Sequence, residues 1–216
     1  MLALYGHPFS SYTWKAKIAL YANANPFEQR MVDPEHADHA AFVAHASPLG
    51  KFPVLVDGDR TLFEATVIIE YLALHHPGPA ELLPTDPDRA LETRMIDRVF
   101  DNYVMAPMQA IVAEHIRSPG MPNPVTEGHA RGELDRAYRW VDAWLGRRAE
   151  ADAITLIECA AAPALFYADW VYPIPMELDR LRQWRAHLLA LPEVARCIDE
   201  ARPYRAYFPL GAPTRD

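Results

Sequence analysis

The segment MLALYGHPFSSYTWKAKIALY (residues 1–21) joins an apolar strand to a helix through a short Gly-His-Pro turn. Leu2–Tyr5 is predicted as the strand, and the helix is predicted from about Thr13. Ser10 or Ser11 can offer a hydroxyl to the unpaired N–H groups at the helix start. A helix N-terminus carries about half a positive charge, so an anion beside Ser10 would be stabilised. The serines are therefore either helix caps alone or also part of an anion site. The helix contains two lysines, and we expect it to be basic and amphipathic.

Composition and charge limit the classes of function. The chain has 216 residues, 50% of them hydrophobic, which is enough for one large or two small packed domains. Its net charge is −8, so we expect no nucleic-acid partner. The apolar runs fall short of the ~20 residues that a membrane span needs, and no signal-peptide pattern opens the sequence. We therefore expect no membrane partner and a cytoplasmic location.

Two cysteines, Cys159 and Cys197, lie within helical patterns and lack the spacing of metal ligands. The sequence therefore predicts reduced thiols in the core, with neither a disulfide framework nor a metal site.

The pattern of elements changes once along the chain. Residues 1–78 alternate strand and helix patterns in the order βαβαββα, over residues 2–5, 13–24, 28–32, 37–45, 54–56, 61–63 and 64–76. Residues 79–87 form a proline-rich linker. Residues 88–216 show helical patterns alone, over residues 88–117, 126–149, 155–172, 178–190 and 192–201. We predict an α/β domain, a linker and an all-α domain with these boundaries.

Three further features are local motifs. Pro53 opens a strand that must pair, and we predict a cis Phe52-Pro53 bond, because it would turn the polar groups of Phe52 outward, toward a ligand along the strand edge. Glu64 lies in the first turn of a predicted helix, where a carboxylate is favourable and can also receive an ammonium group. Thr155 and Glu158 form a capping box that we interpret as purely structural.

Together these residues resemble the cytosolic glutathione transferase family, and the resemblance covers nearly the whole chain. The opening Ser10-Ser11-Tyr12-Thr13-Trp14 and the following Lys15-Ala16-Lys17-Ile18-Ala19-Leu20 are similar to bacterial, serine-type members of the zeta and theta kind. The resemblance implies a thioredoxin-like glutathione-binding domain followed by an all-helical domain. It also implies a homodimer that uses glutathione as co-substrate without a metal.

The resemblance also assigns site residues. It implies that Ser10 is the catalytic residue, whose hydroxyl holds the glutathione sulfur as a thiolate. The residues implied to bind glutathione are Phe9, Ser11, Lys51, Phe52, Pro53, Glu64 and Ala65.

Two positions depart from the family pattern. Ala65 stands where the family usually has serine, so the hydroxyl expected on the γ-glutamyl carboxylate is missing, and Thr66 is a badly angled substitute. His36 and His39 are both candidates for the contact with the glycine end of glutathione.

The resemblance implies a detoxifying transferase that adds glutathione to small electrophilic apolar compounds. The apolar wall of the second-substrate site is expected from Tyr103, Met105 and Met108, with either Trp170 or the Tyr207-Phe208 tail. A glutathione-dependent isomerase or dehalogenase is an alternative, because the zeta-type opening is similar, although Tyr12 replaces its cysteine. A non-catalytic binding protein is another, because of Ala65. Residues 10–13 contain no cysteine, so we do not expect disulfide exchange.

Overall fold

The computed structural model describes residues 1–148 and 153–216. The part from β1 to α3, called the sheet region below, has the predicted order βαβαββα. Its elements are β1 (Leu2–Gly6), α1 (Ser11–Ala22), β2 (Phe27–Met31), α2 (Ala37–Ala46), β3 (Val54–Asp57), β4 (Arg60–Phe63) and α3 (Ala65–His75). The strand order is β2-β1-β3-β4, with β1 and β2 parallel and the other pairs antiparallel.

The part from α4 to the C-terminus, called the helical region, adds no strand among the described residues. Its elements are α4 (Pro87–Val99), a π-helical segment (Phe100–Met105), α5 (Ala106–Arg117), α6 (Pro124–Leu145), α7 (Leu156–Val171), α8 (Asp179–Ala190), α9 (Pro192–Ala201) and a 3₁₀ segment (Arg202–Tyr207). The predicted helix over 88–117 is thus interrupted by a π segment. Pro107 lacks the N–H that would bond the preceding turn, and helices widen at such positions.

The domain and linker boundaries themselves stay predictions. No helix or strand covers residues 77–86. Helix α6 ends at Leu145, before the predicted end at residue 149, which itself lies outside the described residues.

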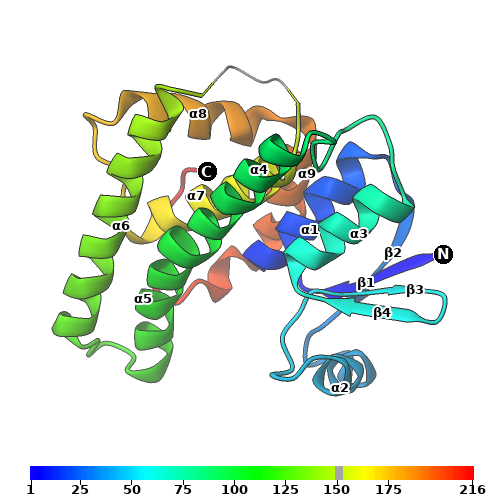
Figure 1. The fold of residues 1–216 in the computed structure, drawn as a ribbon. Coiled ribbons are helices and arrows are strands. Elements are labelled where there is room, and N and C mark those ends of the chain that lie inside the picture. The colour runs from blue at the N-terminus through cyan, green and yellow to red at the C-terminus, as the bar shows by residue number, and fades with distance from the viewer. Residues whose placement is uncertain (149–152) are drawn as a thin grey trace.

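Figure 1 shows how the two regions meet. Helices α1 and α3 cover one face of the sheet, α2 lies on the opposite face, and α7 runs through the middle of the helical region toward α1. The α/β region followed by an all-α region agrees with the fold class that the sequence predicts.

Helix α1 lies at the centre of the molecule, and the expectation that it is amphipathic is wrong. Every residue from Thr13 to Leu20 is buried, including Lys15 at 1% and Lys17 at 3% exposure. The physical reason is that the sheet lies on one side of α1 and the helical region on the other, so the helix has no solvent face. The two lysines are instead neutralised by carboxylates of the helical region.

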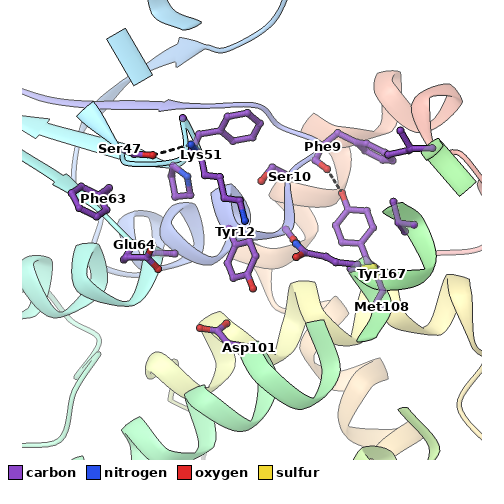
Figure 2. A pocket seen from close by; sticks show the side chains of 18 of the residues that line it. Phe9, Ser10, Tyr12, Ser47, Lys51, Phe63, Glu64, Asp101, Met108 and Tyr167 are labelled. Atoms are coloured by element: carbon purple, nitrogen blue, oxygen red, sulfur yellow. Dashed lines mark hydrogen bonds between the residues drawn. The ribbon is translucent and has the colours of Figure 1, made fainter. Parts of the chain in front are cut away.

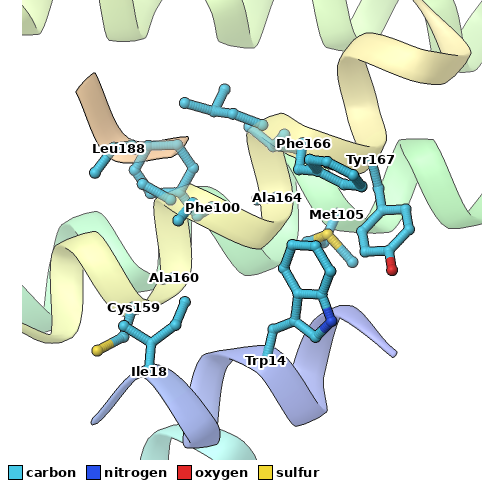
Figure 3. Close-up of a cluster of buried hydrophobic side chains, with 14 of the residues drawn as sticks. Trp14, Ile18, Phe100, Met105, Cys159, Ala160, Ala164, Phe166, Tyr167 and Leu188 are labelled. Atoms are coloured by element: carbon cyan, nitrogen blue, oxygen red, sulfur yellow. The ribbon is translucent and has the colours of Figure 1, made fainter. Parts of the chain in front are cut away.

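The core is continuous across the two regions (Figure 3). Trp14 and Ile18 of α1 face α7, where Ala160 and Ala164 leave room for the close approach of the two helices. Trp14 also packs against Phe166, with ring centroids 4.8 Å apart. Every residue of α7 is buried, so this helix is the common core of both regions.

Two smaller predictions for the core are confirmed. Cys159 and Cys197 are free and buried, and burial raises the pKa of both thiols. Thr155 caps α7 in a capping box in which the Glu158 carboxylate accepts the Thr155 N–H at 2.9 Å.

Candidate active site

A cavity of about 650 Å³ opens between the start of α1 and the helical region. Figure 2 shows its lining from several elements, with Ser10 and Tyr12 near α1, Glu64 near α3 and Asp101 from the helical region. The structure brings all eight residues that the sequence singled out to this cavity, namely Phe9, Ser10, Ser11, Lys51, Phe52, Pro53, Glu64 and Ala65.

The loop before α1 is held in place by hydrogen bonds from both regions. The Tyr167 hydroxyl of α7 donates to the carbonyl of Phe9 at 2.9 Å, as Figure 2 shows. The Trp14 indole N–H donates to the carbonyl of Pro8. The Phe9 N–H donates to Nδ1 of His7 at 3.1 Å, and burial lowers the pKa of His7, which favours the neutral ring that can accept this bond. The loop that carries Ser10 is therefore fixed without any ligand.

Ser10 is both a helix cap and part of the cavity wall. It is the N-cap of α1, and its Oγ accepts the backbone N–H of Thr13 at 3.3 Å. A serine hydroxyl can accept and donate at the same time, so the O–H of Ser10 is free to donate to an anion in the cavity. Ser11 also lines the cavity and is the first residue of α1. The cap and the anion site, which the sequence presented as alternatives, are compatible in one residue.

The segment before β3 forms another wall. The Phe52-Pro53 peptide bond is cis, as the sequence predicts. The N–H of Lys51 donates to Oγ of Ser47 at 2.8 Å, which ties this wall to the end of α2. Lys51 is exposed and lines the cavity.

The start of α3 differs slightly from the prediction. Glu64 is the N-cap residue, one position before the first turn, and has φ 69°. A residue with a Cβ reaches this left-handed region at a cost of about 1–2 kcal/mol. The carboxylate of Glu64 does not cap its own helix, so the first N–H groups of α3 have no side-chain partner there. Within the described chain, this corner therefore offers both a carboxylate and N–H groups without side-chain partners.

Thr66 is not the substitute for a serine that the sequence suggested. Its hydroxyl accepts the ammonium of Lys15 at 2.9 Å and donates to the Asp97 carboxylate at 2.9 Å. Thr66 does not line the cavity. The missing hydroxyl at Ala65 is therefore not replaced by Thr66.

A buried ion network lies behind this corner, and the sequence did not predict it. The Lys15 ammonium lies 2.5 Å from Oδ1 of Asp97 and 2.9 Å from Oδ2 of Asp101. Arg98 pairs with the same two carboxylates. Burial raises the pKa of Asp101, although the charge of Lys15 opposes this shift. The only available signal was the Asp97-Arg98…Asp101 spacing, which places two acids on one helix face.

The electrophile side of the cavity is only partly as predicted. Met108, Tyr207 and Phe208 line it, whereas Met105 at 2% and Trp170 at 8% exposure are core residues. Tyr103 belongs to a second cavity of about 370 Å³. The lining residues of the helical region that the sequence missed are Arg98, Asp101, Asn102, Gln109, Val112, Ile116, Tyr167 and Pro209. A helical pattern does not show which of its apolar positions faces a cavity and which faces the core.

His36 and His39 lie outside this cavity. Nδ1 of His36 is 2.7 Å from the Asp33 carboxylate, and Nδ1 of His39 is 2.7 Å from the carbonyl of Met31. The two rings stack on each other with centroids 5.2 Å apart. Both histidines are therefore engaged within the sheet region.

Within residues 1–148 and 153–216, no group of His, Cys, Asp or Glu side chains could hold a metal ion. Among the helices that the structure describes, none is long and apolar enough to cross a bilayer.

Comparison with known proteins gives consistent results. Residues 4–80 match the family described as "Glutathione S-transferase, N-terminal domain". A glutathione S-transferase of Pseudomonas putida is 32% identical over 134 residues, which are 62% of this chain and 59% of that protein. A probable maleylacetoacetate isomerase of Vibrio cholerae is 23% identical over 94% of this chain and 97% of its own length. A glutathione S-transferase of Methylobacillus flagellatus, solved with glutathione bound, superimposes with a TM-score of 0.78 at 25% identity, over 91% of this chain and 98% of that one.

Proposed function

Because the chain belongs to the cytosolic glutathione S-transferase family, we propose that it transfers the thiol of glutathione to small electrophiles and that Ser10 stabilises the thiolate. The observation that carries the proposal is the position of Ser10, which caps α1 and at the same time lines the large cavity.

The chemistry depends on lowering the pKa of the bound thiol. A free cysteine thiol has a pKa of about 8.5, and the thiolate is the nucleophile. The Ser10 hydroxyl donates a hydrogen bond to the sulfur, and the N-terminus of α1 adds its partial positive charge. Such a bond to an anion contributes about 1.5–3 kcal/mol. Serine does not act as a base here, and the thiol proton passes to water.

In the conjugation step the thiolate sulfur attacks an electrophilic carbon. A C–S bond forms, and a leaving group such as chloride departs with the electron pair of its bond. Met108, Val112, Ile116 and Phe208 supply an apolar surface for the electrophile, while Asn102 and Gln109 add two amides that can hydrogen-bond to it. The second substrate is thus small and mainly apolar.

The remaining cavity residues suit the rest of the peptide. The backbone groups of Phe52, before the cis proline, suit the cysteinyl part of glutathione, as the resemblance to the family implies. Lys51 is a cation beside that wall and suits the glycine carboxylate. The start of α3, with Glu64 and Ala65, suits the γ-glutamyl end.

We include a cytoplasmic homodimer in the proposal. Helices α3 and α4 expose apolar side chains at Val67, Leu74, Leu91 and Met95, at 48%, 76%, 67% and 52% respectively. Exposed apolar side chains gathered on neighbouring helices are typical of subunit interfaces. Sedimentation equilibrium measures the mass, and a monomer at micromolar concentration would contradict this part of the proposal.

A glutathione-dependent isomerase is the second candidate function. The similarity to the Vibrio cholerae protein extends over 94% of this chain, which favours it. Tyr12 lines the cavity at the position where the zeta-type opening has cysteine, which argues against it. Isomerisation of a maleyl-ketoacid in the presence of glutathione separates the two activities.

The central experiment compares Ser10→Ala with Ser11→Ala. We first measure glutathione binding by calorimetry and conjugation of 1-chloro-2,4-dinitrobenzene by the wild-type protein. Ser10→Ala should raise the pKa of the bound thiol by about one unit and lower the rate at neutral pH about tenfold, with a smaller effect on binding. Loss of the cap should also cost about 1 kcal/mol of stability.

Ser11→Ala is the matched control, because it also lines the cavity but does not cap the helix. Its thiolate absorbance should titrate as in the wild type. If Ser11→Ala shifts the titration and Ser10→Ala does not, Ser11 is the thiolate donor. If the wild-type protein binds glutathione without conjugating any electrophile, the non-catalytic alternative is correct.

A further inference from the structure

The helical region contributes a cation to the end of the cavity at α3. Arg98 of α4 lines the cavity together with Glu64 and Ala65. Its side chain is 49% exposed, whereas the neighbouring cation Lys15 is 2% exposed. Arg98 is therefore the cation of the ion network that a ligand in the cavity can reach.

One side of the Arg98 guanidinium is fixed and the other is free. Its Nε donates to Oδ2 of Asp97 at 3.0 Å. Its Nη2 donates to Asp97 and to the Thr66 hydroxyl, and lies 2.9 Å from the carboxylate of Asp101. A guanidinium has five N–H donors. The two on Nη1 have no partner within the part of the chain that the structure describes.

Arg98 and Glu64 form a pair of opposite charges at the corner of the cavity beside α3. Lys15 and Arg98 balance the two carboxylates of Asp97 and Asp101. Glu64 is exposed, lines the same cavity, and forms no ion pair with a cation of the described chain. The corner thus presents a free edge of a guanidinium and a free carboxylate to the same ligand.

This pattern fits an α-amino acid group. Such a group carries a carboxylate and an ammonium on one carbon, so it needs a cation and an anion close together. We propose that Nη1 of Arg98 binds the α-carboxylate of the γ-glutamyl residue of glutathione, while Glu64 receives its α-ammonium. Arg98 then takes the place of the hydroxyl that Ala65 lacks. This inference rests on the proposed function, because it assumes that glutathione occupies the cavity.

Arg98 and Glu64 together would determine which thiols the cavity binds. The N–H groups at the start of α3 can donate hydrogen bonds to any anion. The combination of Arg98 and Glu64 instead selects thiols with an intact zwitterionic γ-glutamyl group. A bond between two ionised groups is stronger than one between neutral groups, so Arg98 contributes more to affinity than a serine hydroxyl would.

The test uses three peptides and calorimetry on the full chain. Glutathione carries both charged groups, 4-aminobutanoyl-Cys-Gly lacks the α-carboxylate, and glutaryl-Cys-Gly lacks the α-ammonium. Arg98→Ala should weaken binding of glutathione and of the glutaryl peptide about tenfold, and of the 4-aminobutanoyl peptide less than about twofold. Glu64→Gln should show the mirror pattern, with the glutaryl peptide least affected.

Thr66→Val is the matched structural control, because it removes one partner of Arg98 outside the cavity. It should lower the midpoint of thermal unfolding and leave the ratios among the three affinities unchanged. If Arg98→Ala destabilises the fold too far for titration, Arg98→Gln carries the test with the same expected pattern.

Equal losses for all three peptides in Arg98→Ala would show that Arg98 acts only through the ion network, and would overturn the inference. Wild-type affinity for glutathione would then still support the proposed function. If the wild-type protein binds none of the three peptides, the proposed function fails and the inference fails with it.

Discussion

Lys15 and Lys17 lie two residues apart on α1 and show how similar side chains acquire different roles. Two residues turn a helix by about 200°, so the lysines point to nearly opposite sides. Both are buried, and both are neutralised by a carboxylate of the helical region. A buried cation therefore indicates where the two regions of this protein meet.

The partners of the two lysines differ. Lys15 contacts Asp97 and Asp101, and through them Arg98, so its network reaches the cavity wall. Lys17 contacts Glu200 of α9, whose carboxylate also accepts the Tyr21 hydroxyl at 2.9 Å. None of the residues on the Lys17 side lines the cavity. The burial of a charge is thus a matter of folding, and its position relative to the cavity decides whether it also affects binding.

The largest effect is expected from Lys15→Met. This change leaves Asp97, whose side chain is fully buried, without its only buried cation partner among the described residues. Removing one partner of a buried ion pair costs about 3–5 kcal/mol. Urea unfolding measures the loss, and the KM for glutathione should rise because Asp101 and Arg98 lose their position. Unchanged KM in a folded Lys15→Met protein would break the proposed link to the cavity.

The next effect is expected from Glu200→Gln, which leaves Lys17 without its carboxylate. Burial alone would raise the pKa of Glu200, but the bonds and charge of Lys17, with the bonds from Tyr21 and Arg196, outweigh it and lower the pKa. A carboxyl with a lowered pKa in the folded state stabilises the fold above its unfolded pKa of about 4.3 and loses this effect as the pH falls through its folded pKa. At neutral pH we expect the free energy of unfolding of Glu200→Gln to be about 2 kcal/mol lower than that of the wild type.

Thermal unfolding of both proteins between pH 7 and pH 3 tests this dependence. The difference in stability between the wild type and Glu200→Gln should shrink steadily below about pH 4. A difference that grows toward acid pH would contradict the assigned direction. Glutathione binding at pH 7 should be the same in both proteins, since Glu200 does not line the cavity.

A smaller effect is expected from Lys17→Met. The side chain of Glu200 is 30% exposed and keeps its bonds from Tyr21 and Arg196, so water and these partners compensate for the lost cation. The loss of stability should be about 1 kcal/mol, the value of one ordinary hydrogen bond. Neither kcat nor KM should change. A loss as large as that of Lys15→Met would remove the contrast between the two lysines.

The smallest effect is expected from Ala65→Ser, which adds a hydroxyl on the cavity side. If Arg98 already holds the γ-glutamyl carboxylate, this neutral donor should tighten glutathione by only about 0.5 kcal/mol. In the Arg98→Ala background the gain should be larger. Calorimetry of Ala65→Ser in the wild-type and Arg98→Ala backgrounds measures the coupling between the two positions. Weaker binding of glutathione in both backgrounds would show that its γ-glutamyl carboxylate lies elsewhere.

Local features of this chain could be predicted from the sequence. The strand and turn before α1, the cis bond at Phe52-Pro53 and the capping box of Thr155 depend on residues that are neighbours in the chain. The order of elements in the sheet region could also be predicted, because the hydrophobic periodicity within each segment indicates a helix or a strand. The resemblance then gathered Ser10, Phe52 and Glu64 into one site, and the structure places all three around one cavity.

Other features depended on the packing of distant segments. The amphipathic expectation for α1 was wrong because the pattern of one helix does not show that a second region covers its other side. Arg98 and Asp101 were missed because they reach the cavity from a helix more than eighty positions after Ser10. Met105 and Tyr103 were assigned to the cavity, although one lies in the core and the other at the second cavity, since a π segment rotates this stretch.

The sequence alone thus indicated the two-part architecture, the serine at the start of α1 and a resemblance to the glutathione transferase family. The architecture and the serine cap rest on backbone preferences and on spacings within short segments, which act before any tertiary contact forms. The tertiary structure decided which charges are buried, which of the two lysines belongs to an ion network that reaches the cavity wall, and that Arg98 lines the cavity. These outcomes depend on burial and on the Coulomb interactions between groups far apart in the chain, which act only once the two regions have packed together.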